Sequence, residues 1–224
     1  MSVAGWLIAA CSAGLLGWIG RPAIALLPES PDAWPDSPTY RAISHAPNLG
    51  AWLAASAIGL VTIVSLAVPD HLLPAWIIVC GVGTWLAYID WRTNLLPTRI
   101  VWPLYIVTLV VVALEAWLAA DVGILIRAAV TSMCAFAVFW VLWWIAQQWR
   151  PGSFGYGDVR LSAPLGLVLG SVGGWAAPTG LYLGFVIGAV VGLAIRARGH
   201  QGEFAFGPAM VAGAVLGVVL ASSN

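Results

Sequence analysis

The sequence predicts an all-α, polytopic integral membrane protein with about eight transmembrane helices. Hydrophobic residues make up 61% of the 224 residues and charged residues only 8%, whereas soluble domains carry roughly 25% charged residues. The mean hydropathy is +0.95, and the 14 tryptophans suit the membrane–water interface. The low charged fraction and the high hydropathy make the lipid bilayer the expected environment. The net charge of zero gives no electrostatic reason to expect nucleic acid.

Apolar runs long enough to cross a bilayer recur along the whole chain. A spanning helix needs about 20 mainly apolar residues, and two of the runs, 75–90 and 161–176, are short and contain glycine. The predicted spans are 3–20, 51–68, 75–90, 100–119, 123–146, 161–176, 178–195 and 205–221. We expect residues 1–224 to form a single membrane-embedded domain.

The arginines support this number of spans. If the connecting loops alternate between two sides, the loops at 21–50, 91–99, 147–160 and 196–204 share one side and hold eight of the nine arginines. The ninth, Arg127, lies within a span. The positive-inside rule makes the arginine-rich side cytoplasmic. The loop 21–50 is rich in proline and too small to bury a core, so we expect an irregular cytoplasmic loop.

Two acidic residues are predicted to lie at the same membrane face. Asp90 ends the third span, which runs inward, and Asp158 opens the sixth, which runs outward. Ionisable residues at the membrane are costly and are candidates for function. Two carboxyl groups in contact share a proton and titrate as a pair. An aspartyl protease needs such a pair, because one carboxylate takes a proton from water while the protonated partner polarises the scissile carbonyl.

Glycines precede the second acid in "SFGYGDVRLS". We expect Gly155 and Gly157 to adopt backbone conformations closed to other residues and to let an extended substrate approach closely. The alternative is a simple helix start with Asp158 near the positive end of the helix dipole.

The remaining ionisable and sulfur-containing residues suggest structural roles. Glu115 and Arg127 lie near the outer ends of consecutive spans, where we expect them to snorkel or to pair with each other. The cysteines are widely spaced in apolar runs, which predicts small buried side chains and neither a disulfide nor a metal site. The isolated histidines at 45, 71 and 200 are expected to be solvated.

Three segments resemble motifs of a known family. "GYGDVRLSAPLGLVLG" resembles the second active-site motif of the type IV prepilin peptidases, which contains the GxGD signature of membrane aspartyl proteases. "DWRTNLLPTRIVWP" resembles the first motif, an Asp followed by a basic residue and Leu-Pro. "FAFGPAMVAGAVLG" resembles the C-terminal FGP segment. The resemblance covers about residues 75–221.

The resemblance implies an activity and a site. It implies a membrane aspartyl endopeptidase of the inner membrane that cleaves the positively charged leader of a prepilin or pilin-like precursor at the cytoplasmic face. Asp90 and Asp158 would be the catalytic pair. The supporting or substrate-binding residues would be Gly155, Gly157, Arg160, Arg92 and Pro97.

The sequence departs from this family in three places. Arg160 and Thr98 stand where the family usually has Lys and Asn, and a guanidinium is a broader, planar donor than an ammonium. Many members carry a tetra-cysteine zinc domain where this chain has the 21–50 loop, which contains no cysteine. We therefore predict a short form with no metal and no cofactor.

Two other functions are compatible with parts of the pattern. Glycine-interrupted spans and paired acids also suit a small proton-coupled transporter, although both aspartates are predicted at span ends rather than at the midplane. A catalytically inactive relative acting in pilus assembly is the other alternative, and the presence of both aspartates argues against it.

Overall fold

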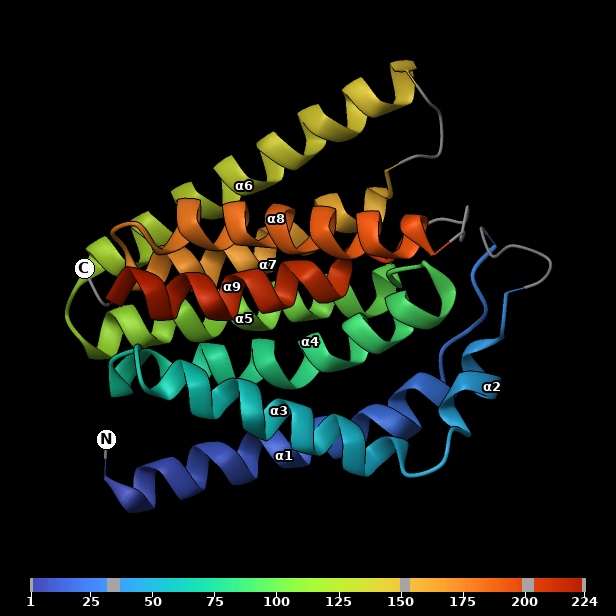
Figure 1. The fold of residues 1–224 in the computed structure, drawn as a ribbon. Helices are drawn as coiled ribbons and strands as arrows, with labels where there is room; N and C mark the ends of the chain where they lie inside the picture. Colours follow the sequence, from blue (N-terminus) through green and yellow to red (C-terminus); the bar gives the residue numbers. More distant parts are fainter. Residues whose placement is uncertain (1, 32–36, 150–153, 199–203, 223–224) are drawn as a thin grey trace.

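The structure, a computed structural model, describes residues 2–31, 37–149, 154–198 and 204–222, and within these ranges the only regular elements are helices. They are α1 (Val3–Ala25), α2 (Tyr40–Ser44), α3 (Leu49–Ser65), the 3-10 turn η1 (Asp70–Leu72), α4 (Leu73–Thr93), α5 (Thr98–Leu118), α6 (Val122–Trp149), α7 (Tyr156–Val172), α8 (Ala176–Ala197) and α9 (Gly207–Ser222). The eight long helices run along roughly one direction, and α1 begins at the same end of the molecule at which α9 ends (Figure 1). The predicted all-α membrane fold is confirmed.

Each predicted span corresponds to one long helix. Among the described residues, five segments are long and apolar enough to cross a bilayer: α1, η1 with α4, α5, α6 and α8. The helices α3, α7 and α9 are shorter, with 17, 17 and 16 residues, or about 25 Å at 1.5 Å per residue. A short α7 is accommodated because it packs among α4, α5, α6, α8 and α9, so that most of its residues are buried within protein.

Two predicted boundaries are wrong. The span predicted at 161–176 is α7, which ends at Val172 because Gly173 and Gly174 adopt left-handed backbone angles, with φ of +82° and +59°. The 21–50 segment is not irregular throughout. Helix α1 continues through Pro22, although proline has no N–H to donate to the preceding turn. Helix α2 forms after the N-cap Thr39.

Helices α8 and α9 pack with their backbones almost in contact. A Cβ atom on Gly213 of α9 would lie 2.3 Å from the backbone nitrogen of Gly184 on α8, so no side chain fits there. Small residues at a helix interface allow this close approach in membranes, where lipid-facing surfaces gain nothing from association by the hydrophobic effect. The pairing fixes where α9 begins, at the end of the molecule where the candidate site lies.

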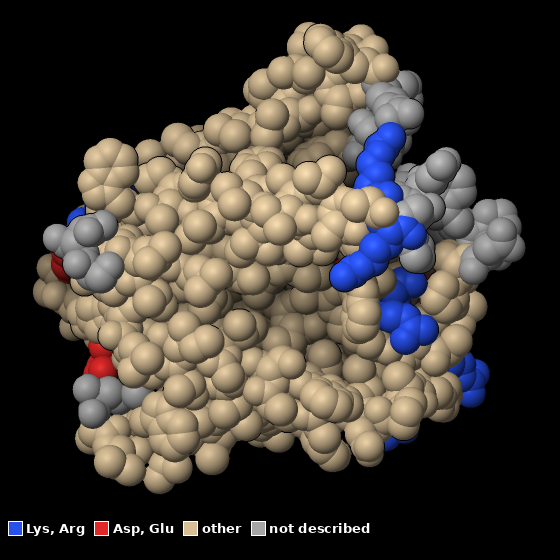
Figure 2. Space-filling model, in the orientation of Figure 1, with Lys and Arg blue, Asp and Glu red and all other residues tan. Residues whose placement is uncertain are grey.

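The arginines gather at one end of the molecule. In Figure 2 most of the basic side chains lie at one end of the helices and the visible acidic ones at the other. Of the residues that carried the sidedness argument, Arg150 lies outside the described ranges. At the opposite end, Arg127 forms an ion pair of 3.7 Å with Asp121. The alternation of loops that the sequence predicted is thus preserved in the fold.

Candidate active site

Asp90 and Asp158 come from different helices and line the same pocket. Asp90 lies in the last turn of α4 and Asp158 in the first turn of α7, and both residues are buried, with 4% and 6% of their surface exposed. Both residues line one cavity of about 550 Å³ at the arginine-rich end. The arrangement brings together the two acids that the sequence singled out.

Asp90 is held by the start of α9. The backbone N–H of Gly207 donates a hydrogen bond of 2.7 Å to Oδ2 of Asp90. Gly207 is the first residue of α9, where backbone N–H groups have no partner inside the helix and the helix dipole is positive. This contact stabilises the negatively charged form of the Asp90 carboxylate. The FGP segment seen in the sequence therefore contributes a backbone donor to the site.

Asp158 follows a short glycine turn. Gly155 is the N-cap of α7 with φ −75° and ψ 134°, and its carbonyl oxygen accepts the N–H of Asp158 at 3.3 Å. Gly157 is already helical, and neither glycine has a positive φ. The expectation of special backbone angles is therefore wrong.

Close packing explains the glycine directly before Asp158. A Cβ on Gly157 would lie 2.7 Å from the Cβ of Leu96, which is closer than real carbon atoms approach. Leu96 belongs to the segment between α4 and α5 and lines the same cavity as the aspartates. The glycine lets this segment pack directly onto the first turn of α7.

Arg160 joins α7 to α5 beside the pocket. Its guanidinium donates a hydrogen bond to Oγ1 of Thr98, the first residue of α5, and lies 4.6 Å from the centre of the Tyr156 ring. Arg160 and Thr98 are the two positions at which the chain departs from the motifs it resembles. The two substituted residues therefore contact each other. Both residues line the cavity that holds the aspartates.

The two other supporting residues lie in different places. Pro97 is the N-cap of α5 and lines the cavity with the aspartates. Arg92 lines a separate and larger groove beside α4. The sequence does not show that Pro97 and Arg92 line different cavities, because it does not specify how α4 is rotated against its neighbours.

One wall of the pocket was missed by the sequence analysis. Residues 27–31 and Tyr40 line it, and both carboxylate oxygens of Glu29 accept the backbone N–H of Tyr40 at 3.0 Å. Burial, and secondly the charge of Glu29, raises the pKa of the Tyr40 hydroxyl above its ordinary value. The sequence signals this wall only by the acidic residues, Glu29 among them, within the segment 21–50 that is predicted to be an irregular loop.

At the far end of the bundle, the expected pairing of Glu115 with Arg127 is wrong. Glu115 is buried, and its Oε1 accepts the N–H of Ala75 at 2.8 Å, so the side chain caps the start of α4. Arg127 pairs with Asp121 instead. Within the described residues, no cluster of three or more His, Cys, Asp or Glu side chains could hold a metal ion.

Comparisons with known proteins agree with the motifs. The sequence profile of the type IV leader peptidase family matches residues 76–195, more than half of the chain, and this range contains both aspartates. Neither the curated proteins nor the solved structures give a match. On the strength of the family match, this chain belongs to the type IV leader peptidase family.

Proposed function

We propose that this protease is an aspartyl endopeptidase that removes the leader of prepilin or pilin-like precursors at the cytoplasmic face of the inner membrane. Membership of the leader peptidase family supports the class of substrate. The single observation that carries the aspartyl mechanism is the pair of buried carboxyl groups, Asp90 and Asp158, that line one cavity. The gathering of arginines at this end supports a cytoplasmic site.

The surroundings of the two acids favour distinct roles. The N–H of Gly207 stabilises the ionised form of Asp90, so Asp90 is the better base. Asp158 then carries the shared proton. Asp90 takes a proton from water as the water oxygen attacks the scissile carbonyl carbon, while Asp158 gives its proton to the carbonyl oxygen. When the tetrahedral intermediate collapses, Asp90 passes its proton to the leaving amine and Asp158 recovers its own, which regenerates the pair.

Replacement of each acid tests the proposal. Asp90→Asn and Asp158→Asn, assayed with a pilin-like precursor in proteoliposomes, are each expected to reduce cleavage at least about 10³-fold. The double variant is expected to be no slower than either single variant, because the pair acts as one unit. Asp121→Asn, which alters an acid at the far end of the bundle, is the control and should cleave at the wild-type rate. Robust cleavage by either single variant would contradict the aspartyl mechanism, whereas no cleavage by the wild-type protein would favour the transporter alternative.

A further inference from the structure

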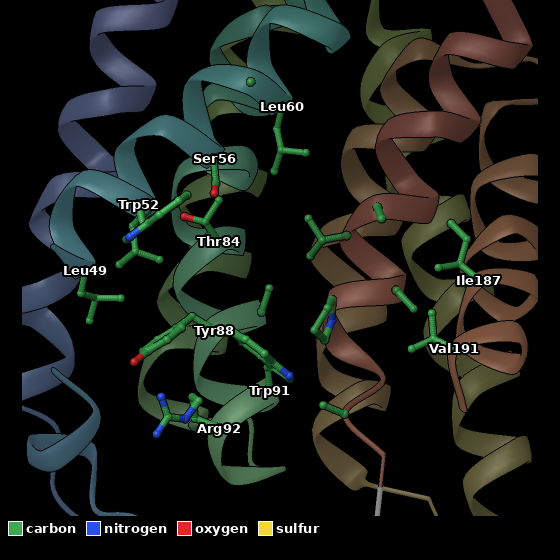
Figure 3. A pocket seen from close by; sticks show the side chains of 18 of the residues that line it. Leu49, Trp52, Ser56, Leu60, Thr84, Tyr88, Trp91, Arg92, Ile187 and Val191 are labelled. Carbon is green, nitrogen blue, oxygen red and sulfur yellow. The ribbon is translucent and has the colours of Figure 1, made fainter. Parts of the chain in front are cut away.

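A second cavity, distinct from the pocket that holds the aspartates, forms a groove in the described part of the chain. It has a volume of about 1090 Å³ and lies between α3 and α4 on one side and α8 and α9 on the other. Figure 3 shows Trp52 and Leu60 of α3 with Tyr88 of α4 on one wall, and Ile187 and Val191 of α8 on the other. The surface is hollowed between α9 and α3 in Figure 2.

The groove is apolar along nearly its whole length. Arg92 is the only charged side chain among the residues that line it, and it lies at the arginine-rich end. The hydroxyl groups of Thr84 and Tyr88 already donate to backbone carbonyl oxygens, at 2.7 and 2.9 Å, so they require no polar partner from an occupant. An occupant must therefore be apolar over most of its length.

The groove adjoins the candidate active site at two places. Asn94, which follows α4, lines both cavities. In α9, Gly207 donates to Asp90, and its neighbour Pro208 lines the groove. A chain that leaves the aspartate pocket past Asn94 therefore enters the groove.

We propose that this groove holds the apolar segment of the precursor that follows the cleaved bond, in helical form. The inference rests on the proposed function. Within a bilayer a lone segment satisfies its backbone hydrogen bonds only as a helix. The groove follows α3 from Leu49 to Ile63, a rise of about 21 Å at 1.5 Å per residue, which matches about four turns of a partner helix.

The chemistry of the two cavities also orients the precursor. The polar, charged leader belongs in the aspartate pocket, whose lining carries both acidic and basic side chains, Glu29 and Arg99 among them. The apolar segment belongs in the groove, where Gly59 leaves open space because no atom of a neighbouring helix lies within 4 Å of the position of a Cβ. A lipid chain would suit the apolar wall as well, but contact with the aspartate pocket favours the segment that is continuous with the scissile bond.

Two tryptophan substitutions on α8 test the groove. Val191 lines it, whereas Leu193, two residues further on, does not and is 70% exposed. Two substrates are compared: a pilin-like precursor with an apolar segment of about 20 residues, and a soluble peptide that spans the bond but lacks this segment. In Val191→Trp the ratio of kcat/KM for precursor over peptide should fall about tenfold or more, and Leu193→Trp should keep the wild-type ratio. A wild-type ratio in Val191→Trp would overturn the proposal.

Crosslinking gives a second measurement that does not depend on turnover. A photoreactive amino acid is placed at position 191 or 193 in the Asp158→Asn background, and the same precursor is added in proteoliposomes. We expect the precursor to crosslink at 191 and not at 193. Crosslinks at 191 to lipid alone would overturn the groove proposal while the aspartate variants still decide the mechanism. Conversely, active aspartate variants would refute the mechanism without bearing on where the segment crosslinks.

Discussion

Leu96 and Gly157 are packed so closely that the Cβ of a side chain at 157 would lie 2.7 Å from the Cβ of Leu96. Leu96 follows α4, which carries Asp90, and Gly157 directly precedes Asp158 in α7. This contact therefore helps to set how the ends of the two helices approach each other. The spacing of the Asp90 and Asp158 carboxyl groups therefore depends on the absence of a side chain at Gly157.

Gly157→Ala is expected to inactivate the enzyme although alanine favours helices. The added methyl group must displace the 94–97 segment or the first turn of α7, and a misplacement of about 1 Å can cost about 10²-fold in rate. Cleavage of a precursor and the amount of membrane-inserted protein are measured together. The control is Gly192→Ala on α8, where the new Cβ would lie 3.7 Å from Phe204, an ordinary contact. Wild-type cleavage by Gly157→Ala would mean that the contact with Leu96 has no role in catalysis.

Gly207→Ala is expected to slow cleavage about 10²-fold by displacing the carboxylate of Asp90. A Cβ at this position would lie 2.9 Å from Oδ2 of Asp90, so the hydrogen bond from the Gly207 N–H would be lost or distorted. A matched control is Gly83→Ala, at the same interface of α4 and α9, where the Cβ would lie 3.5 Å from Val211. Equal rates for the two variants would show that the bond to Asp90 is dispensable.

Arg160 and Thr98 are expected to act as a coupled pair. Thr98→Val removes the acceptor of the Arg160 guanidinium, and Arg160→Ala removes the donor. Each change should lower stability by about 1 kcal/mol, with the double variant little worse than either single one. Thermal unfolding of the four proteins in detergent gives the coupling energy. Strictly additive losses would mean that the hydrogen bond between the two side chains contributes nothing.

The orientation of the helices can be tested with single cysteines in a cysteine-free variant. Arg198 lies at the arginine-rich end and His71 at the other, and both are exposed. An impermeant thiol reagent should label His71→Cys in intact cells and Arg198→Cys only in inverted membrane vesicles. Labelling of both positions from the same side would refute an odd number of crossings between them, together with the cytoplasmic placement of Asp90 and Asp158.

A buried residue at the end of α4 would be unsuited to this labelling test. Thr93 is buried, with 3% of its surface exposed, so a cysteine there would be shielded from the reagent whichever side it faced. Arg198, which caps the end of α8, avoids that ambiguity.

The sequence by itself determined the long helices, the end at which the arginines gather, and the presence of Asp90 and Asp158 at that end. These properties follow from the lengths of apolar runs and from their alternating direction across the bilayer. Once the runs are counted, the ends of the third and sixth spans must lie at the same face. The motifs around the two acids indicated the family on the same local basis.

Only the tertiary structure decided what each of the supporting residues contacts. Glu115 caps the start of α4 rather than pairing with Arg127. Gly157 leaves room for the side chain of Leu96 rather than adopting special backbone angles. Arg92 lines the groove rather than the aspartate pocket. These contacts depend on the rotation and depth of each helix against its neighbours. In a chain whose helices are apolar on nearly every side, periodicity does not reveal that rotation, and side-chain packing between helices determines it.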